Sequence, residues 1–175
     1  MSDARVAVLM GSDSDYEVME ETVKTLREFE IACDVHAMSA HRSPAAVAEY
    51  SSKAKSRGIR VIIAAAGGAA HLAGVVAAHT PLPVIGVPLV ATTLAGLDSL
   101  LSTVQMPPGI PVATVAVGKF GARNAALLAV QILALSDAAL EKKFEAFKAG
   151  LSAQVAEKDK KLQEKIKTGA AGAKS

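Results

Sequence analysis

Aromatic residues and cysteine are both scarce in this sequence. Only 3% of the 175 residues are aromatic and none is tryptophan, which is too few for the stacking surfaces that bind single-stranded nucleic acid. The single cysteine, Cys33, excludes a disulfide framework and any metal cluster held by several thiolates. We therefore expect no nucleic-acid partner and no stabilising disulfides.

Long hydrophobic runs and a secretory leader are also missing. Glycine, proline or histidine interrupts each apolar run well before it reaches membrane-spanning length. The N-terminus, Met-Ser-Asp-Ala-Arg, lacks the apolar core of a signal peptide. Hydrophobic residues still make up 51% of the chain and charged residues 21%, a globular composition. These features predict a cytoplasmic protein that has no membrane partner.

The excess positive charge lies near the end of the chain. Residues 1–140 contain 10 Lys and Arg against 12 Asp and Glu, whereas residues 141–175 contain 9 against 5. The formal net charge of +2 therefore reflects a lysine-rich tail and not a basic binding surface. Because this length suits one core, we expect one folded domain over 1–140. Residues 141–175 are expected to be a charged helical extension of that domain with a frayed end.

Short apolar segments alternate with helical segments along most of the chain. Strands are expected at 5–10, 31–38, 60–66, 83–87 and 112–117, and helices at 15–29, 44–57, 67–79, 98–105 and 123–135. This alternation predicts a three-layer α/β fold with a doubly wound parallel sheet. The last segment, 138–168, is expected to form one long charged helix or a pair of helices.

Chemically capable side chains follow the first three expected strands. The loops read Gly-Ser-Asp-Ser-Asp at 11–15, Ser-Ala-His-Arg-Ser-Pro at 39–44 and Gly-Gly-Ala-Ala-His at 67–71. In open α/β sheets, ligands bind beyond the carboxyl ends of the strands. We therefore expect these loops to converge on one binding site.

The first loop has two interpretations. Ser12 and Asp15 stand where a strand leads into a helix, and the backbone N–H groups at a helix N-terminus bind phosphate. The same side chains equally suit helix capping. The loop lacks a Walker lysine and the G-x-G-x-x-G pattern, so it indicates neither a nucleoside triphosphate nor a dinucleotide. The carboxylate of Asp15 would repel phosphate and would suit ribose hydroxyls.

Two of the histidines follow strands. His41 has an imidazole suited to proton transfer near neutral pH, and its neighbour Arg42 suits bidentate binding of phosphate. The alternative for this pair is a surface turn before Pro44. His71 is equally compatible with a ligand role and with a structural bond to a backbone carbonyl at a helix start. With no H-x-x-x-H or carboxylate-flanked pair, the sequence predicts proton transfer on a phosphorylated small molecule without metal or cofactor.

Five blocks of sequence resemble one enzyme family. They are GSDSD at 11–15, SAHRSP at 39–44, AGGAAHL at 66–72, DSLLSTVQMP at 98–107 and NAALLAVQIL at 124–133. Over residues 4–140 the chain resembles the class I branch of the phosphoribosylaminoimidazole carboxylase family of purine biosynthesis, the N5-carboxyaminoimidazole ribonucleotide mutases. Class II members, which carboxylate aminoimidazole ribonucleotide with CO2 directly, carry SAHK and an AGRSN-like segment instead. Arg42 and His71 therefore favour class I.

The resemblance implies a fold, an activity and a set of site residues. The fold would be flavodoxin-like, with the catalytic domain over 1–140 assembled as a homo-octamer that has its sites at subunit junctions. The activity would be an isomerisation that moves a carboxylate within a ribonucleotide. His41 would be the general acid and base, Ser12 and Arg42 would bind phosphate, and Asp15 would bind ribose. The imidazole ring and CO2 would be surrounded by Ser39, Ala40, Gly67, Gly68, Ala69, Ala70, His71 and Leu72.

Three places depart from the family pattern. Ala73 stands where proline is usual, Val90-Ala91-Thr92 replaces a loop that commonly contains Gln and Ser, and Phe120 and Arg123 replace small residues. We expect none of these changes to touch the catalytic residues. The change at Phe120 and Arg123 is expected to alter packing between subunits.

Two other functions remain as alternatives at this point. A class II carboxylase would share the fold and differ in its carboxyl donor. A non-enzymatic flavodoxin-like module would bind a nucleotide or receive a phosphoryl group, with Asp13 and Asp15 as an acidic pocket. A receiver also needs a phosphate-accepting Asp at the end of the third strand, where this chain has Ala65-Ala66-Gly67.

Overall fold

A five-stranded parallel sheet organises the first 133 residues. This computed structural model describes residues 4–172, and their side chains as far as residue 169. The strands are β1 (Val6–Met10), β2 (Cys33–Ala37), β3 (Val61–Gly67), β4 (Val84–Leu89) and β5 (Ala113–Thr114). They lie in the order β2-β1-β3-β4-β5, and every pairing is parallel. This is the flavodoxin-like order, so the predicted fold class is confirmed.

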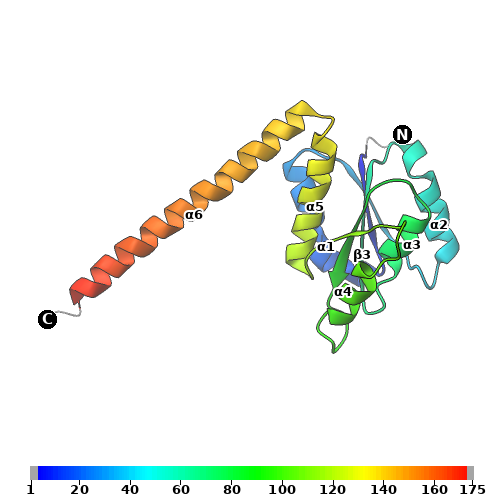
Figure 1. Ribbon diagram of the computed structural model, residues 1–175, viewed down its shortest axis with the longest axis horizontal. Coiled ribbons are helices and arrows are strands. Elements are labelled where there is room, and N and C mark those ends of the chain that lie inside the picture. The colour runs from blue at the N-terminus through cyan, green and yellow to red at the C-terminus, as the bar shows by residue number, and fades with distance from the viewer. Residues whose placement is uncertain (1–3, 173–175) are drawn as a thin grey trace. The chain divides into compact units, whose positions relative to one another are not determined.

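Helices flank the sheet (Figure 1). They are α1 (Tyr16–Glu28), α2 (Pro44–Lys53), α3 (Leu72–Ala78), α4 (Leu97–Val104) and α5 (Lys119–Ala134), with single 3-10 turns at Asp13–Asp15 and Lys55–Arg57. α1 and α5 are tied together because the buried Thr22 hydroxyl donates a hydrogen bond of 2.7 Å to the Ala122 carbonyl. On one face of the sheet, Leu9 and Ile62 belong to the same core cluster as Val47 of α2 and Leu72 of α3.

The continuously apolar strands occupy the centre of the sheet. Every residue of β1 and the first five residues of β3 are buried, as expected where helices cover both faces of a parallel sheet. β5 is shorter than the predicted 112–117, because only Ala113 and Thr114 pair with β4 at the sheet edge. Since the central strands are fixed on both sides, the loops that leave their carboxyl ends begin from well-defined positions.

The third helix begins later than the sequence predicts. Its start was expected at Gly67-Gly68, but Gly67 is the last residue of β3 and α3 begins at Leu72. Gly68 has a positive φ of 61°, which glycine adopts without strain, and the N–H of Ala70 donates to the Gly68 carbonyl. Residues 68–71 therefore form a loop that brings His71 to the start of α3.

Residues from Ala134 onward form a second compact unit. Its main element is α6 (Ala138–Gly172), one continuous helix where the sequence allowed one or two. Leu151, Val155, Leu162 and Ile166 are exposed along it. The frayed end was expected in the closing segment Gly-Ala-Ala-Gly-Ala-Lys-Ser at 169–175. α6 continues to Gly172, and residues 173–175 lie outside the described residues. Among the residues described, no helix combines the length and apolar character needed to cross a membrane.

Candidate active site

Loops from the carboxyl ends of β1, β2 and β3 line a single cavity of about 460 Å³. The structure brings nine of the predicted site residues to its wall: Ser12, Asp15, Ser39, Ala40, His41, Arg42, Gly67, Ala69 and Leu72. Four residues that the sequence did not single out as ligands also line it: Gly11, Ser14, Ala66 and Ala91. The cavity therefore lies where a doubly wound sheet binds its ligands.

Three predicted site residues are not part of this wall. Ala70 is only 2% exposed and belongs to the buried core. Gly68 lies beside the Thr92 side chain, 3.4 Å from where a Cβ would be. His71 is exposed and contacts His41, which does line the cavity.

The first loop is a capping box. The Ser12 N–H donates to an Asp15 carboxylate oxygen at 3.0 Å, and the Ser14 N–H donates to the Ser12 hydroxyl at 3.4 Å. Ser12 and Asp15 thus cap the 3-10 turn that precedes α1, while Asp15 makes no side-chain cap bond at the start of α1 itself. Burial raises the pKa of Asp15 above its ordinary value of 3.8, and the hydrogen bond from Ser12 opposes that rise. The site consequently contains a carboxylate that is partly desolvated before any ligand binds.

The second loop is held by the hydroxyl of Ser39. This oxygen accepts the backbone N–H groups of His41 at 3.3 Å and Arg42 at 3.1 Å. Ser43 occupies the N-cap position of α2 as predicted, but its side chain makes no cap bond. Its hydroxyl instead donates to the Ser39 carbonyl and accepts the Ser39 N–H, both at 3.0 Å. The turn that carries the histidine and the arginine is thus closed by two serines.

Arg42 is exposed and only weakly engaged by the protein. Its Nη2 donates to the Gly11 carbonyl at 3.4 Å, which directs the guanidinium across the end of β1 toward the first loop. An arginine side chain has five N–H donors, and this bond uses one of them. The others are in a position to bind an anion beside Ser12.

His41 and His71 form a hydrogen-bonded pair. His41 Nε2 lies 2.8 Å from His71 Nδ1, with ring centroids 4.9 Å apart and the ring planes at 79°. Because β1 lies between β2 and β3, this contact crosses the carboxyl end of β1. The sequence alternatives for His71 were a ligand and a backbone carbonyl, whereas the structure gives its ring an imidazole partner.

Comparison with known proteins identifies the family. Residues 5–154 match the family described as AIR carboxylase. The chain belongs to the AIR carboxylase family. It is 57% identical over 159 residues to the N5-carboxyaminoimidazole ribonucleotide mutase of Mycobacterium leprae, covering 91% of this chain and 92% of the relative. It is 52% identical over 159 residues to the mutase of the same name from Pyrococcus horikoshii, covering 91% and 89%.

A solved structure agrees with this assignment. The chain is similar to the crystal structure of Treponema denticola PurE, with a TM-score of 0.82 and 29% sequence identity. The match covers 90% of this chain and 97% of that one. The AIR carboxylase fold therefore extends over nearly the whole sequence.

The departures from the AIR carboxylase pattern lie in different surroundings. Ala91 lines the cavity, and the expectation that none of the departures touches the catalytic residues stays a prediction. Its neighbour Thr92 donates to Asp98 at 2.6 Å, and this bond lowers the pKa of Asp98. Ala73 lies in the first turn of α3 and is buried in the core. In α5, Arg123 pairs with Glu21 of α1 at 3.1 Å.

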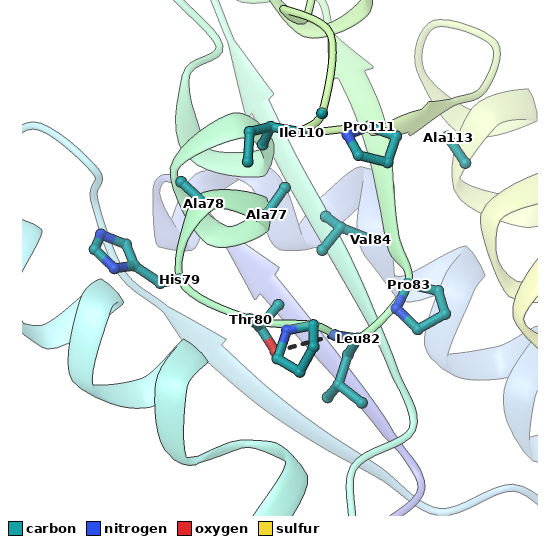
Figure 2. Close-up of a pocket in the computed structure, with 12 residues that line it drawn as sticks. Ala77, Ala78, His79, Thr80, Leu82, Pro83, Val84, Ile110, Pro111 and Ala113 are labelled. Carbon is teal, nitrogen blue, oxygen red and sulfur yellow. Dashed lines mark hydrogen bonds between the residues drawn. The ribbon is translucent and has the colours of Figure 1, made fainter.

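A larger cavity of about 710 Å³ lies elsewhere, at the amino end of β4. Figure 2 shows its wall, which consists mainly of alanine, proline and branched aliphatic residues. Among the described residues that line it, His79 is the only one with a titratable side chain. The Thr80 hydroxyl accepts a hydrogen bond from the Leu82 N–H at 3.3 Å. Because it lacks converging polar groups and lies at the wrong edge of the sheet, this cavity is not the candidate active site.

Among the described residues, no group of three or more His, Cys, Asp or Glu side chains is placed to hold a metal ion. The reactive groups at the cavity are therefore an imidazole pair, a guanidinium, a carboxylate and several hydroxyls.

Proposed function

We propose that this chain converts N5-carboxyaminoimidazole ribonucleotide into 4-carboxy-5-aminoimidazole ribonucleotide, a step of purine (IMP) biosynthesis. The observation that carries the proposal is the placement of His41 and Arg42 on the wall of one cavity with the capped loop at Ser12 and Asp15. Support also comes from more than half identity, over nine-tenths of the chain, to relatives named as mutases for this ribonucleotide.

The cavity offers separate binding groups for the two ends of such a substrate. The phosphate would accept hydrogen bonds from Arg42, from the Ser12 hydroxyl and from backbone N–H groups of the first loop. Asp15 would accept the ribose hydroxyls. Burial raises the pKa of Asp15, which means that its ionised form is disfavoured in the empty site. Hydrogen bonds from the ribose hydroxyls would offset this loss of solvation. The imidazole ring would then lie toward His41 and the loop at Gly67–Ala69.

The reaction needs one proton to enter and one to leave. Protonation of the exocyclic nitrogen lets the carbamate break its N–C bond and release CO2, with the bonding electron pair remaining on nitrogen. C4 of the electron-rich ring then attacks CO2, and loss of the C4 proton restores aromaticity. His41 would supply the first proton and accept the second, because the exocyclic nitrogen is attached to the ring carbon next to C4 and one imidazole can reach both atoms.

CO2 must remain beside C4 between these two steps. The wall near the third strand is made of small residues, with Ala66, Gly67 and Ala69 from β3 and its loop and Ala91 from the loop after β4. Such a surface lets the ring and a small neutral molecule pack closely while water is excluded. The partly apolar character of this wall supports a mutase, in which the carboxyl group is not exchanged with solvent.

The proposal extends to a cytoplasmic homo-octamer, as the family resemblance implies. Supporting it, Leu97, Leu101 and Val104 lie three and four residues apart on α4 and are about half exposed, at 56%, 47% and 48%. Leu94, just before α4, is 60% exposed. An apolar face of this kind on a globular unit marks an interaction surface. The molar mass from light scattering tests the octamer directly, and a mass equal to one or two chains would reject it.

The carboxyl donor distinguishes the mutase from the class II carboxylase. Purified protein is given either the N-carboxylated ribonucleotide alone or aminoimidazole ribonucleotide with bicarbonate, and formation of the C4-carboxylated product is followed. The mutase should use the first substrate efficiently. In a single turnover with carboxyl-labelled substrate and unlabelled bicarbonate, the label should reach C4 with little dilution. Complete dilution, or a preference for the second pair of substrates, would reject the mutase and favour direct carboxylation.

A further inference from the structure

The contact between His41 and His71 constrains where protons can lie. Two imidazole nitrogens 2.8 Å apart form a hydrogen bond only when one carries a proton and the other presents a lone pair. If both nitrogens carried protons, or neither did, the contact would be repulsive. The pair therefore holds one proton between the rings, and each ring has one remaining nitrogen that is outside the contact.

Both histidines lie on turns whose backbone is held by hydrogen bonds. The His41 N–H is bound to the Ser39 hydroxyl at 3.3 Å. The His71 N–H donates to the Ala69 carbonyl at 2.8 Å, and its carbonyl accepts the Val75 N–H in the first turn of α3. Leu72, the next residue, is buried in the core. His71 is thus a firmly anchored partner for a catalytic ring that stands on a loop.

The pair can release one proton and take one back, as the proposed reaction requires. A cationic His41 has protons on both nitrogens and donates its Nε2–H to the lone pair of His71 Nδ1. When His41 releases its other proton, from Nδ1, the Nε2–H bond to His71 is unchanged. When Nδ1 accepts a proton again, the bond is still unchanged. The ring can therefore give and take one proton without losing its orientation.

We propose that His71 is a positioning residue that accepts a hydrogen bond from His41 Nε2 and so makes His41 Nδ1 the atom that exchanges protons with the substrate. This inference rests on the proposed function. In the reaction, Nδ1–H protonates the exocyclic nitrogen as the N–C bond of the carbamate breaks. After the new C–C bond has formed, the Nδ1 lone pair takes the C4 proton, and His41 returns to its starting state.

Replacement of His71 tests this role. His71→Phe keeps a ring but removes the acceptor, whereas His71→Asn retains an amide oxygen at the position of Nδ1. We expect His71→Phe to lower kcat by about 10- to 100-fold, the scale for partners that orient a functional histidine, with KM changed less than about 3-fold. His71→Asn should recover most of the lost kcat. The matched control is His79→Phe at the other end of α3, which should leave kcat unchanged.

A spectroscopic measurement on the wild-type protein gives an independent readout. Long-range ¹H–¹⁵N NMR spectra, assigned with the single-histidine variants, should show His71 with a protonated Nε2 and an unprotonated Nδ1 at the pH of the assay. The opposite tautomer, with a proton on His71 Nδ1, would overturn the proposal. So would His71→Phe with wild-type kcat, or an Asn variant as slow as the Phe variant. If the wild-type protein failed to isomerise the nucleotide, the proposed function would fall, while the NMR result would still decide the pairing of the rings.

Discussion

Replacement of Arg42 by alanine should separate recognition of phosphate from the rest of binding. Arg42 is exposed, and its bond to the Gly11 carbonyl is long at 3.4 Å, so the fold loses little when the side chain is removed. Surface substitutions of this kind change the free energy of unfolding by no more than about 0.5 kcal/mol. A charge-assisted hydrogen bond contributes about 1.5–3 kcal/mol. Because about 1.4 kcal/mol corresponds to a tenfold change in affinity, Kd for a phosphorylated ligand should rise about 10- to 150-fold.

The assay is calorimetric titration with two ligands that differ only in the phosphate. Aminoimidazole ribonucleotide should bind Arg42→Ala weakly, and its dephosphorylated nucleoside should bind as it does to the wild type. Arg60→Ala is the matched control, because Arg60 is an exposed arginine just before the amino end of β3 and should bind both ligands normally. Equal losses of affinity for nucleotide and nucleoside in Arg42→Ala would refute the reasoning, since they would place Arg42 against the ring or the ribose.

Three other substitutions test the remaining parts of the cavity. His41→Asn should lower kcat by at least about 100-fold with the nucleotide still bound, and turnover within a few-fold of wild type would move the proton transfer to another group. Asp15→Asn keeps an acceptor for the Ser12 N–H but removes a carboxylate whose pKa is raised by burial. Above the raised pKa, Asp15 is ionised in the folded protein, and its desolvated charge lowers the free energy of unfolding. Well below pH 3.8 the group is protonated in both the folded and the unfolded protein, so this effect disappears. Chemical unfolding should therefore find Asp15→Asn more stable than wild type at neutral pH, with the gain fading as the pH falls toward 3.8; a gain that grew in acid would contradict this sign. Ala69→Phe should reduce turnover by about 100-fold through misplacement of the ring, while ribose 5-phosphate binds normally; loss of both would indicate a distorted loop.

The sheet and its binding edge could be predicted from the sequence because the signals are local. An apolar run specifies a buried strand at the same residues, as at β1 and β3. The capping residues Ser12 and Asp15 likewise bond to groups only two or three residues away. The start of α3 was misplaced because glycines before an alanine-rich segment indicate a helix opening as readily as a loop. Only the backbone shows that Gly68 adopts a positive φ and delays the helix to Leu72.

The histidine pair could not be predicted, because its partners are 30 residues apart and lie on the loops after β2 and β3, two strands that are not neighbours. Neither spacing nor composition specifies which side chains meet across a third strand. The same reason applies to Ala91, which reaches the cavity from the loop after β4. A signal was present in the flavodoxin-like strand order, which places the loops after the second and third strands on either side of the first.

The hydrogen bond between His41 and His71 also reports on how β1, β2 and β3 dock together. Adjacent strands are separated by about 4.8 Å, so β2 and β3 lie about 10 Å apart on either side of β1. His41 and His71 lie on the segments that follow these two outer strands, so their rings can meet only when β2 and β3 have both docked against β1. Formation of the imidazole contact during refolding would therefore show when β1, β2 and β3 reach their native alignment, whether or not substrate is bound.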